Sequence, residues 1–178
     1  MPAIDHLRTI VSDAFCDVPP PEEGETFTAY DPDCDDFLDV YERSGSTWAT
    51  LLRYLESGDE VAAWRIGAAF HFLTPTALHY FSPMYLLFSL DSKSGDLPST
   101  LTFLLGPMSH ELNPMRRFEY LNNIWGLYSE RQRFAVGATI LLLNAEGHEL
   151  PFDARWTELV FTGRVKREWL GLLPVTGD

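Results

Sequence analysis

The sequence is poor in lysine and cysteine, and both shortages narrow the possible functions. Only two of its 13 basic residues are lysines, against 26 acidic residues, so the formal net charge is −13. Nucleic-acid binding requires Lys and Arg that displace the counterions of phosphates. No basic cluster here offsets so acidic a chain, and we expect no nucleic-acid partner. The two cysteines, Cys16 and Cys34, are too few for a disulfide scaffold and lie in no metal or redox spacing.

A secretory signal and an uninterrupted membrane span are also missing. The first residues contain no basic stretch followed by an apolar run. The most apolar window, residues 67–90, is interrupted by His71, Pro75, His79 and Pro83. These residues favour buried structure in a globular protein over a membrane helix. We therefore expect a cytoplasmic protein, in a reducing compartment, with no membrane partner.

Compact catalytic and cofactor motifs do not occur either. The sequence contains no HExxH, paired CxxC, glycine-rich phosphate loop or Gly-x-Ser-x-Gly elbow. The pattern most similar to a known site is that of a twelve-residue calcium-binding loop. Its oxygen-ligand positions are occupied by Asp31, Asp33, Asp35, Asp39 and Glu42. Asp36 stands where that loop needs glycine for its sharp turn. We predict no metal, no cofactor and no catalytic residues.

Length and composition indicate one well-packed domain over residues 1–178. The chain is 46% hydrophobic and 13% aromatic, and it is long enough to bury a substantial core. No linker, internal repeat or low-complexity segment interrupts it.

Apolar spacing predicts that most of the chain is helical. Ile4, Leu7, Val11, Ala14 and Phe15 follow the 3,4 spacing of one helical face, and the three prolines that follow, residues 19–21, end this first helix. Further helices fit residues 99–105, the segment after Asn113-Pro114, and residues 151–173.

Capping signals mark the other helix starts. Ser46 or Thr47 precedes a helix with Trp48, Leu51, Leu52 and Leu55. The Ser57–Glu60 capping-box spacing precedes a helix carrying Val61, Trp64 and Ala68. Thr74-Pro75 and Ser82-Pro83 predict two helical pieces that meet at a kink near Pro83, and Ser129–Gln132 is a second capping box, for a helix through Leu143.

The segment from Pro19 to about Ser46 shows no such periodicity. We interpret it as irregular and acidic, with at most a short strand at Thr26–Tyr30. The expected fold is therefore mainly α: a single compact helical domain with an irregular acidic segment and at most a small β element.

Three stretches of the chain form recognisable motifs. Residues 14–21, A-F-C-D-V-P-P-P, fit the pattern A-F-x-D-V-P-x-P, and residues 72–85 fit F-L-T-P-x-A-x-x-Y-x-x-P-x-Y. A late Ser-x-x-Gln-Arg helix spans Ser129 to Leu143. With these motifs the chain resembles a family of small bacterial proteins of unknown function. The resemblance implies a compact, mainly helical bacterial domain, and it implies no reaction, cofactor or site.

The acidic charge is concentrated in the first third of the chain. Residues 1–60 hold 15 acidic residues against three arginines, a balance of −12, whereas the remainder balances at −1. Such a field attracts a basic surface, and aromatic residues among the acids can supply buried anchors. The predicted partner-binding residues are Glu22, Glu23, Glu25, Tyr30, Asp31, Asp33, Asp35, Asp36, Phe37, Asp39, Tyr41 and Glu42, with the three aromatic ones as anchors.

Two functions fit this pattern. The first is a non-enzymatic acidic binding protein, a bacterial immunity or antitoxin protein that neutralises a basic, nuclease-type toxin by direct binding. The alternative is a small helical enzyme or small-molecule-binding domain with a pocket near His71, His79 and Tyr85. A third interpretation of the acidic segment is a solvated loop that keeps the protein soluble.

Overall fold

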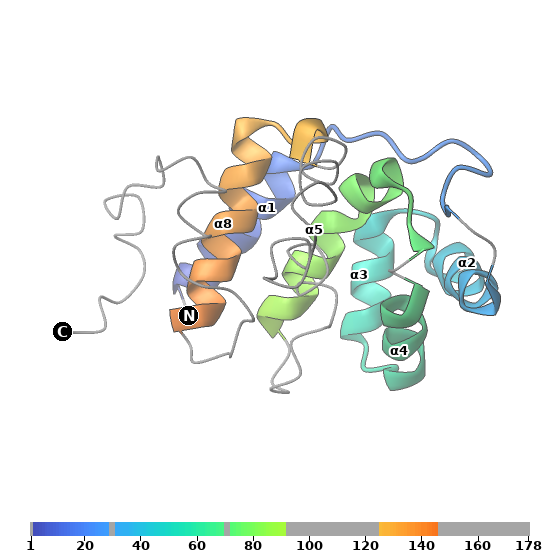
Figure 1. Ribbon diagram of the computed structural model, residues 1–178. Helices are drawn as coiled ribbons and strands as arrows, with labels where there is room; N and C mark the ends of the chain where they lie inside the picture. Colours follow the sequence, from blue (N-terminus) through green and yellow to red (C-terminus); the bar gives the residue numbers. More distant parts are fainter. Residues whose placement is uncertain (1, 29–30, 70–71, 92–124, 146–178) are drawn as a thin grey trace, which may run out of the picture. The chain divides into compact units, whose positions relative to one another are not determined.

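The computed structural model describes residues 2–28, 31–69, 72–91 and 125–145, which are mostly helical (Figure 1). The helices are α1 (Pro2–Ala14), α2 (Pro32–Ser44), α3 (Trp48–Glu56), α4 (Glu60–Ala69), α5 (Pro75–Asp91) and α8 (Glu130–Ala145), with a short 3-10 turn, η3 (Trp125–Leu127). The predicted mainly α fold is confirmed. The helices predicted at residues 99–105, after Pro114 and at 151–173 lie outside the described residues.

Internal contacts divide the chain into two units. Unit 1 combines residues 1–16 with residues 104–178, and unit 2 is the continuous segment 17–103. In unit 1, α1 packs against α8, and in unit 2 α2 packs against α4 and α3 against α5. The single domain predicted over residues 1–178 stays a prediction. Within the described residues, no helix is both long enough and apolar enough to cross a membrane.

In unit 1, α1 buries the residues that its apolar spacing predicts. Leu7, Val11 and Ala14 are buried, and Phe15, just past the helix end, is fully buried. The Phe15 ring meets the Tyr128 ring edge-on, with 5.9 Å between centroids. Such edge-to-face pairs add to the gain from burial.

The second predicted capping box, at the start of α8, is confirmed. The Ser129 N–H donates to Gln132 Oε1 at 2.8 Å, and the Gln132 N–H donates to Ser129 Oγ at 3.3 Å. Two N–H groups that have no partner inside the helix are thereby satisfied.

In unit 2, α5 is the most deeply buried helix. Phe81, Met84 and Leu86 have no exposed surface, and the Tyr85 hydroxyl donates to the Ile66 carbonyl of α4 at 3.1 Å. The predicted start at Thr74-Pro75 is confirmed, because Thr74 Oγ1 accepts from the Ala77 N–H at 3.1 Å.

The predicted second start at Ser82-Pro83 is wrong. Residues 75–91 form one helix with Pro83 inside it. Ser82 does not cap a new helix; its hydroxyl donates to the Leu78 carbonyl at 2.7 Å, as a serine within a helix does. Proline cannot donate a helical hydrogen bond, yet α5 continues past Pro83 as one helix.

The boundary between α3 and α4 also corrects a prediction. Thr47 caps α3 as expected, in a reciprocal pair with Thr50. The predicted Ser57–Glu60 capping box does not form, because Ser57 ends α3 and Asp59 caps α4, accepting from the Ala62 N–H at 3.0 Å. Gly58 lies between them at φ +92°. This left-handed conformation ends α3, so α4 begins only after Asp59.

The predicted β element is a single bridge. Phe27 pairs antiparallel with Leu73, the Thr28 N–H donates to Phe72 O at 2.7 Å, and the Thr74 N–H donates to Thr26 O at 3.0 Å. The bridge ties the acidic segment to the start of α5. Tyr30, at the end of the predicted strand, lies outside the described residues.

Candidate partner-binding surface

The acidic segment predicted as irregular from Pro19 to Ser46 contains a regular helix, α2. Asp31 caps it by accepting from the Asp33 N–H at 3.1 Å, and Pro32 occupies the first turn. Asp33 and Asp35 lie in that turn, where negative charge is favourable beside the positive end of the helix dipole. Gly45, at φ +105°, ends the helix. These local signals outweigh the repulsion among the carboxylates.

Phe37, predicted as a surface anchor, belongs to the core of unit 2. Its side chain is 0% exposed, and its ring makes edge-on contacts with Phe27 and Phe81, at centroid distances of 5.5 and 5.1 Å. The prediction was wrong because α2 is amphipathic, and Phe37 shares its buried side with Cys34 and Val40.

Tyr41, the other described aromatic anchor, is half-buried and tied to the end of α2. Its hydroxyl donates to the Ser46 carbonyl at 2.6 Å, and its ring stacks edge-on with Phe81 at 5.2 Å. Burial, together with a hydrogen bond involving Tyr80, raises the pKa of Tyr41. Tyr41 is therefore held by contacts within unit 2, which fix the C-terminal end of α2.

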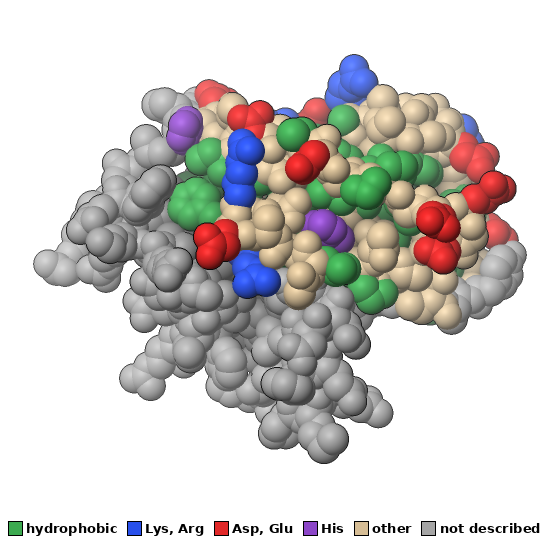
Figure 2. Space-filling view, turned by 90° about the horizontal axis from the view of Figure 1, so that it is seen from above, with side chains coloured by type: hydrophobic (Ala, Val, Ile, Leu, Met, Phe, Trp, Pro, Cys, Tyr) green, Lys and Arg blue, Asp and Glu red, His purple; other side chains and the backbone are tan. Residues whose placement is uncertain are grey.

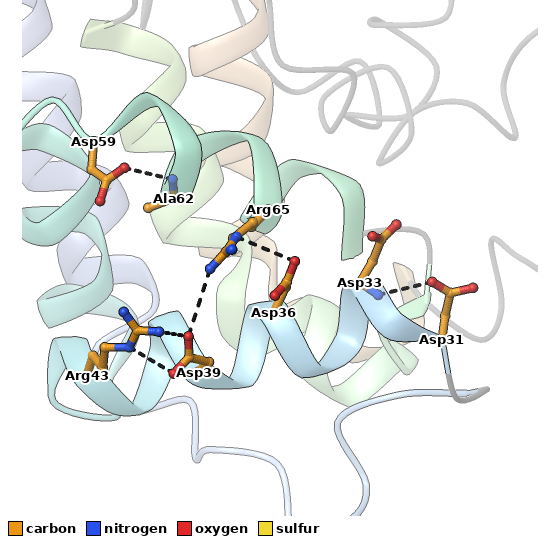
Figure 3. A network of polar contacts seen from close by, with 8 residues as sticks. All are labelled: Asp31, Asp33, Asp36, Asp39, Arg43, Asp59, Ala62 and Arg65. Atoms are coloured by element: carbon orange, nitrogen blue, oxygen red, sulfur yellow. Dashed lines mark hydrogen bonds and ion pairs between the residues drawn. The ribbon is translucent and has the colours of Figure 1, made fainter.

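Two of the predicted carboxylates form ion pairs within unit 2 (Figure 3). Arg65 of α4 reaches across to α2, with its Nε 3.4 Å from Asp36 Oδ2 and its Nη1 3.9 Å from Asp39 Oδ2. Arg43, one turn along α2, also pairs with Asp39. Partly exposed pairs of this kind contribute at most about 1 kcal/mol each, but they orient Asp36 and Asp39 at the α2–α4 boundary.

Three acids of α2, the ion-paired Asp39 among them, lie opposite its buried side. Asp35, Asp39 and Glu42 follow i, i+4, i+7 spacing, so they share one side of the helix, which we call the acidic face of α2. Asp35 and Glu42 are exposed and Asp39 is half-buried; in the preceding segment Glu22, Glu23 and Glu25 are all exposed. Figure 2 shows acidic side chains grouped where Figure 1 draws α2 and the segment before it.

The calcium-loop spacing does not correspond to a calcium loop. Such a loop wraps its oxygens round one ion, whereas residues 32–44 form a helix that points successive side chains about 100° apart. In the part of the chain that the structure describes, no cluster of three or more His, Cys, Asp or Glu side chains could hold a metal ion.

The pocket considered near His71, His79 and Tyr85 is not supported by the Tyr85 position. Tyr85 is buried, its hydroxyl is bonded to the Ile66 carbonyl, and burial raises its pKa well above the ordinary value. His79 is half-buried, and His71 lies outside the described residues. Tyr85 is therefore a core residue whose hydroxyl is engaged within unit 2.

Sequence reasoning missed a pair of exposed apolar side chains on α4. The spacing of Val61, Trp64 and Ala68 suggested the inner side of this helix, but Val61 is 61% and Trp64 66% exposed. The buried side consists of Ala62, Ile66 and Ala69. Both sets have helical spacing, so periodicity alone could not choose between them.

Comparison with protein-family models, with curated proteins and with solved structures found no match.

Proposed function

We propose that the protein is a non-enzymatic acidic binding protein that neutralises a basic partner by direct contact, as a bacterial immunity or antitoxin protein does with a nuclease-type toxin. The observation that carries the proposal is the exposed acidic face of α2, with Asp35 and Glu42 on its outer side. The exposed Glu22, Glu23 and Glu25 of unit 2 extend the same charge along the chain.

The physical basis is electrostatic attraction over several ångströms of solvent. The −12 balance of residues 1–60 creates a negative field that attracts positive surfaces and accelerates encounter, most strongly at low salt. Carboxylates on a rigid helix can occupy a cleft that otherwise accepts phosphates, because both groups are anionic hydrogen-bond acceptors. Binding in that cleft would block the partner's activity without any chemistry by the inhibitor.

The first step of the test is an affinity pull-down from the bacterium that encodes the protein, with the whole chain as bait. The protein that binds to the bait is then purified. The association rate is measured by stopped-flow at about 10 and 150 mM salt. The Debye length shortens to roughly 8 Å at the higher concentration, so charges attract each other over a shorter range. We expect the double variant Asp35→Asn with Glu42→Gln to associate several-fold more slowly at low salt, and to depend less on salt.

The matched control is Asp5→Asn with Asp17→Asn, which removes the same charge elsewhere. Asp5, like Asp35, lies in the first turn of a helix, and both control residues are exposed. Equal association rates for the two double variants would contradict a role for the acidic face. Turnover of a substrate by the isolated chain would contradict the non-enzymatic proposal.

A further inference from the structure

The exposed pair on α4 is unusual for the surface of a folded domain. Val61 and Trp64 are one turn apart, so they lie side by side on the helix, and about two-thirds of each side chain faces solvent. Large aromatic residues exposed in this way are enriched in protein interfaces, where tryptophan is prominent among the residues that dominate binding energy.

The pair adjoins the carboxylates of α2. Around α4, at about 100° per residue, Val61 falls between Trp64 and Arg65. Arg65 in turn pairs with Asp36 and Asp39 of α2 (Figure 3). The surface of unit 2 therefore passes from Trp64 over Val61 and the Arg65 ion pairs to the acidic face of α2.

We propose that Val61 and Trp64 are the apolar anchor of a docking surface whose charged part is the acidic face of α2, and that the occupant is a lysine- or arginine-rich surface of a protein partner. This inference rests on the proposed function and names the residues that hold the complex together once charge has brought the partner in. It gives to α4 the anchoring role that Phe37, buried in the core, cannot perform.

Side-chain chemistry favours such an occupant. The indole of Trp64 binds a guanidinium or ammonium group over its ring face. Val61 offers a place for the aliphatic part of a long basic side chain, and the exposed Asp35 and Glu42 present carboxylates to neighbouring basic groups. An aromatic ring beside several carboxylates thus satisfies both the apolar and the charged parts of Lys and Arg.

A second copy of the chain is a poorer occupant of this surface. Each copy carries a net charge of −13, and a symmetric dimer through α4 would bring two acidic faces close together. Like charges brought together oppose association. Charge complementarity therefore selects a basic partner.

Site-specific photocrosslinking in the encoding bacterium tests the inference with the full-length protein. The probe p-benzoylphenylalanine replaces, in separate variants, Trp64, Glu42 and, as a control, Ala49, which is exposed on α3. We expect positions 64 and 42 to capture the same basic protein and position 49 to capture none.

Dissociation kinetics with that purified protein complete the test. We expect Trp64→Ala to raise the dissociation rate about tenfold or more with little change in association, and Trp64→Phe to do so less. The matched control is Leu127→Ala, which removes another exposed apolar side chain, 42% exposed, and should leave the rate unchanged. Far-ultraviolet circular dichroism checks that all variants are folded.

The outcomes separate the two proposals. Capture from position 42 but not 64, or an unchanged dissociation rate for Trp64→Ala, overturns the anchor and leaves the proposed function standing. Capture of a second copy, or of a partner without a basic surface, also overturns the inference. Absence of capture from both positions overturns the inference and the proposed function together.

Discussion

Phe37 is flanked in the sequence by Asp35, Asp36 and Asp39, yet its ring is fully buried against Phe27 and Phe81. We expect Phe37→Ala to lower the free energy of unfolding by about 3–5 kcal/mol, because it removes apolar burial and leaves a cavity. Urea unfolding followed by circular dichroism measures this loss. Phe37→Leu should lose clearly less, and a loss below about 1 kcal/mol for the alanine variant would show that the ring is not packed as described.

Asp59 provides a pH-dependent prediction. The hydrogen bond from the Ala62 N–H, with a smaller contribution from the Tyr54 hydroxyl, lowers the pKa of Asp59. A carboxyl whose pKa is lower in the folded state stabilises the fold when it is ionised, above its ordinary pKa of about 4. That contribution is lost as the pH falls through the lowered folded-state pKa.

The measurement compares wild type with Asp59→Asn, which keeps an oxygen that can cap α4 but cannot ionise. We expect the thermal midpoint of wild type to exceed that of the variant near neutral pH, and the difference to shrink as the pH falls below about 4. A difference that stays constant down to about pH 2 would contradict this role of the ionised carboxyl.

At the scale of single residues, three predicted caps were right, whereas the burial of Phe37 was not predicted. Thr47, Thr74 and Ser129 cap helices as expected, because a cap depends on neighbours within three residues. The burial of Phe37 depends on Phe81, far along the chain, and on α2 being a helix. A sequence of alternating acids gives no direct sign of either condition.

Among the elements, α5 begins with a residue that has two partners. Thr74 caps the helix through the Ala77 N–H, and its hydroxyl donates to Glu25 O at 2.7 Å. We expect Thr74→Ala to cost about 1–2 kcal/mol, since it loses the cap and releases the acidic segment. Thr74→Ser, which keeps the hydroxyl, should recover most of the stability in the same chemical unfolding assay. Equal losses for both variants would mean that the methyl group, not the hydroxyl, matters.

The errors at this scale share a cause. The helix α2 was overlooked although Asp31, Pro32 and Gly45 are strong boundary signals, because its buried side consists of only a few residues among many acids. On α4 the sequence offered two sides with helical spacing, and only packing in unit 2 decided that Ala62, Ile66 and Ala69 face inward. The exposed anchor on α4 was therefore hidden from sequence reasoning.

For the molecule as a whole, the −13 charge predicts an unusual response to salt. Repulsion among the acids of residues 1–60 opposes folding. Salt screens this repulsion, because the Debye length falls from roughly 30 Å at 10 mM to about 8 Å at 150 mM salt. We expect the free energy of unfolding to rise over this range, and to rise less for Asp35→Asn with Glu42→Gln. A decrease with salt would indicate that the Arg65 and Arg43 ion pairs outweigh the repulsion.

The mainly helical class was predictable at this scale because helical apolar spacing recurs along most of the chain outside residues 19–46. The division into units was not, because it depends on α1 finding α8 across the entire length of unit 2. Nothing local to residues 2–14 marks that partner.

This arrangement has a consequence for synthesis on the ribosome. Unit 2 is one uninterrupted segment, so its helices can pair as soon as they leave the exit tunnel, whereas α1 emerges first and must wait for α8. During that interval the apolar side of α1, with Leu7, Val11 and Phe15, has no native partner from α8 to cover it. The nascent chain therefore offers a chaperone a binding stretch in α1, which disappears once α8 has left the exit tunnel and packs against it.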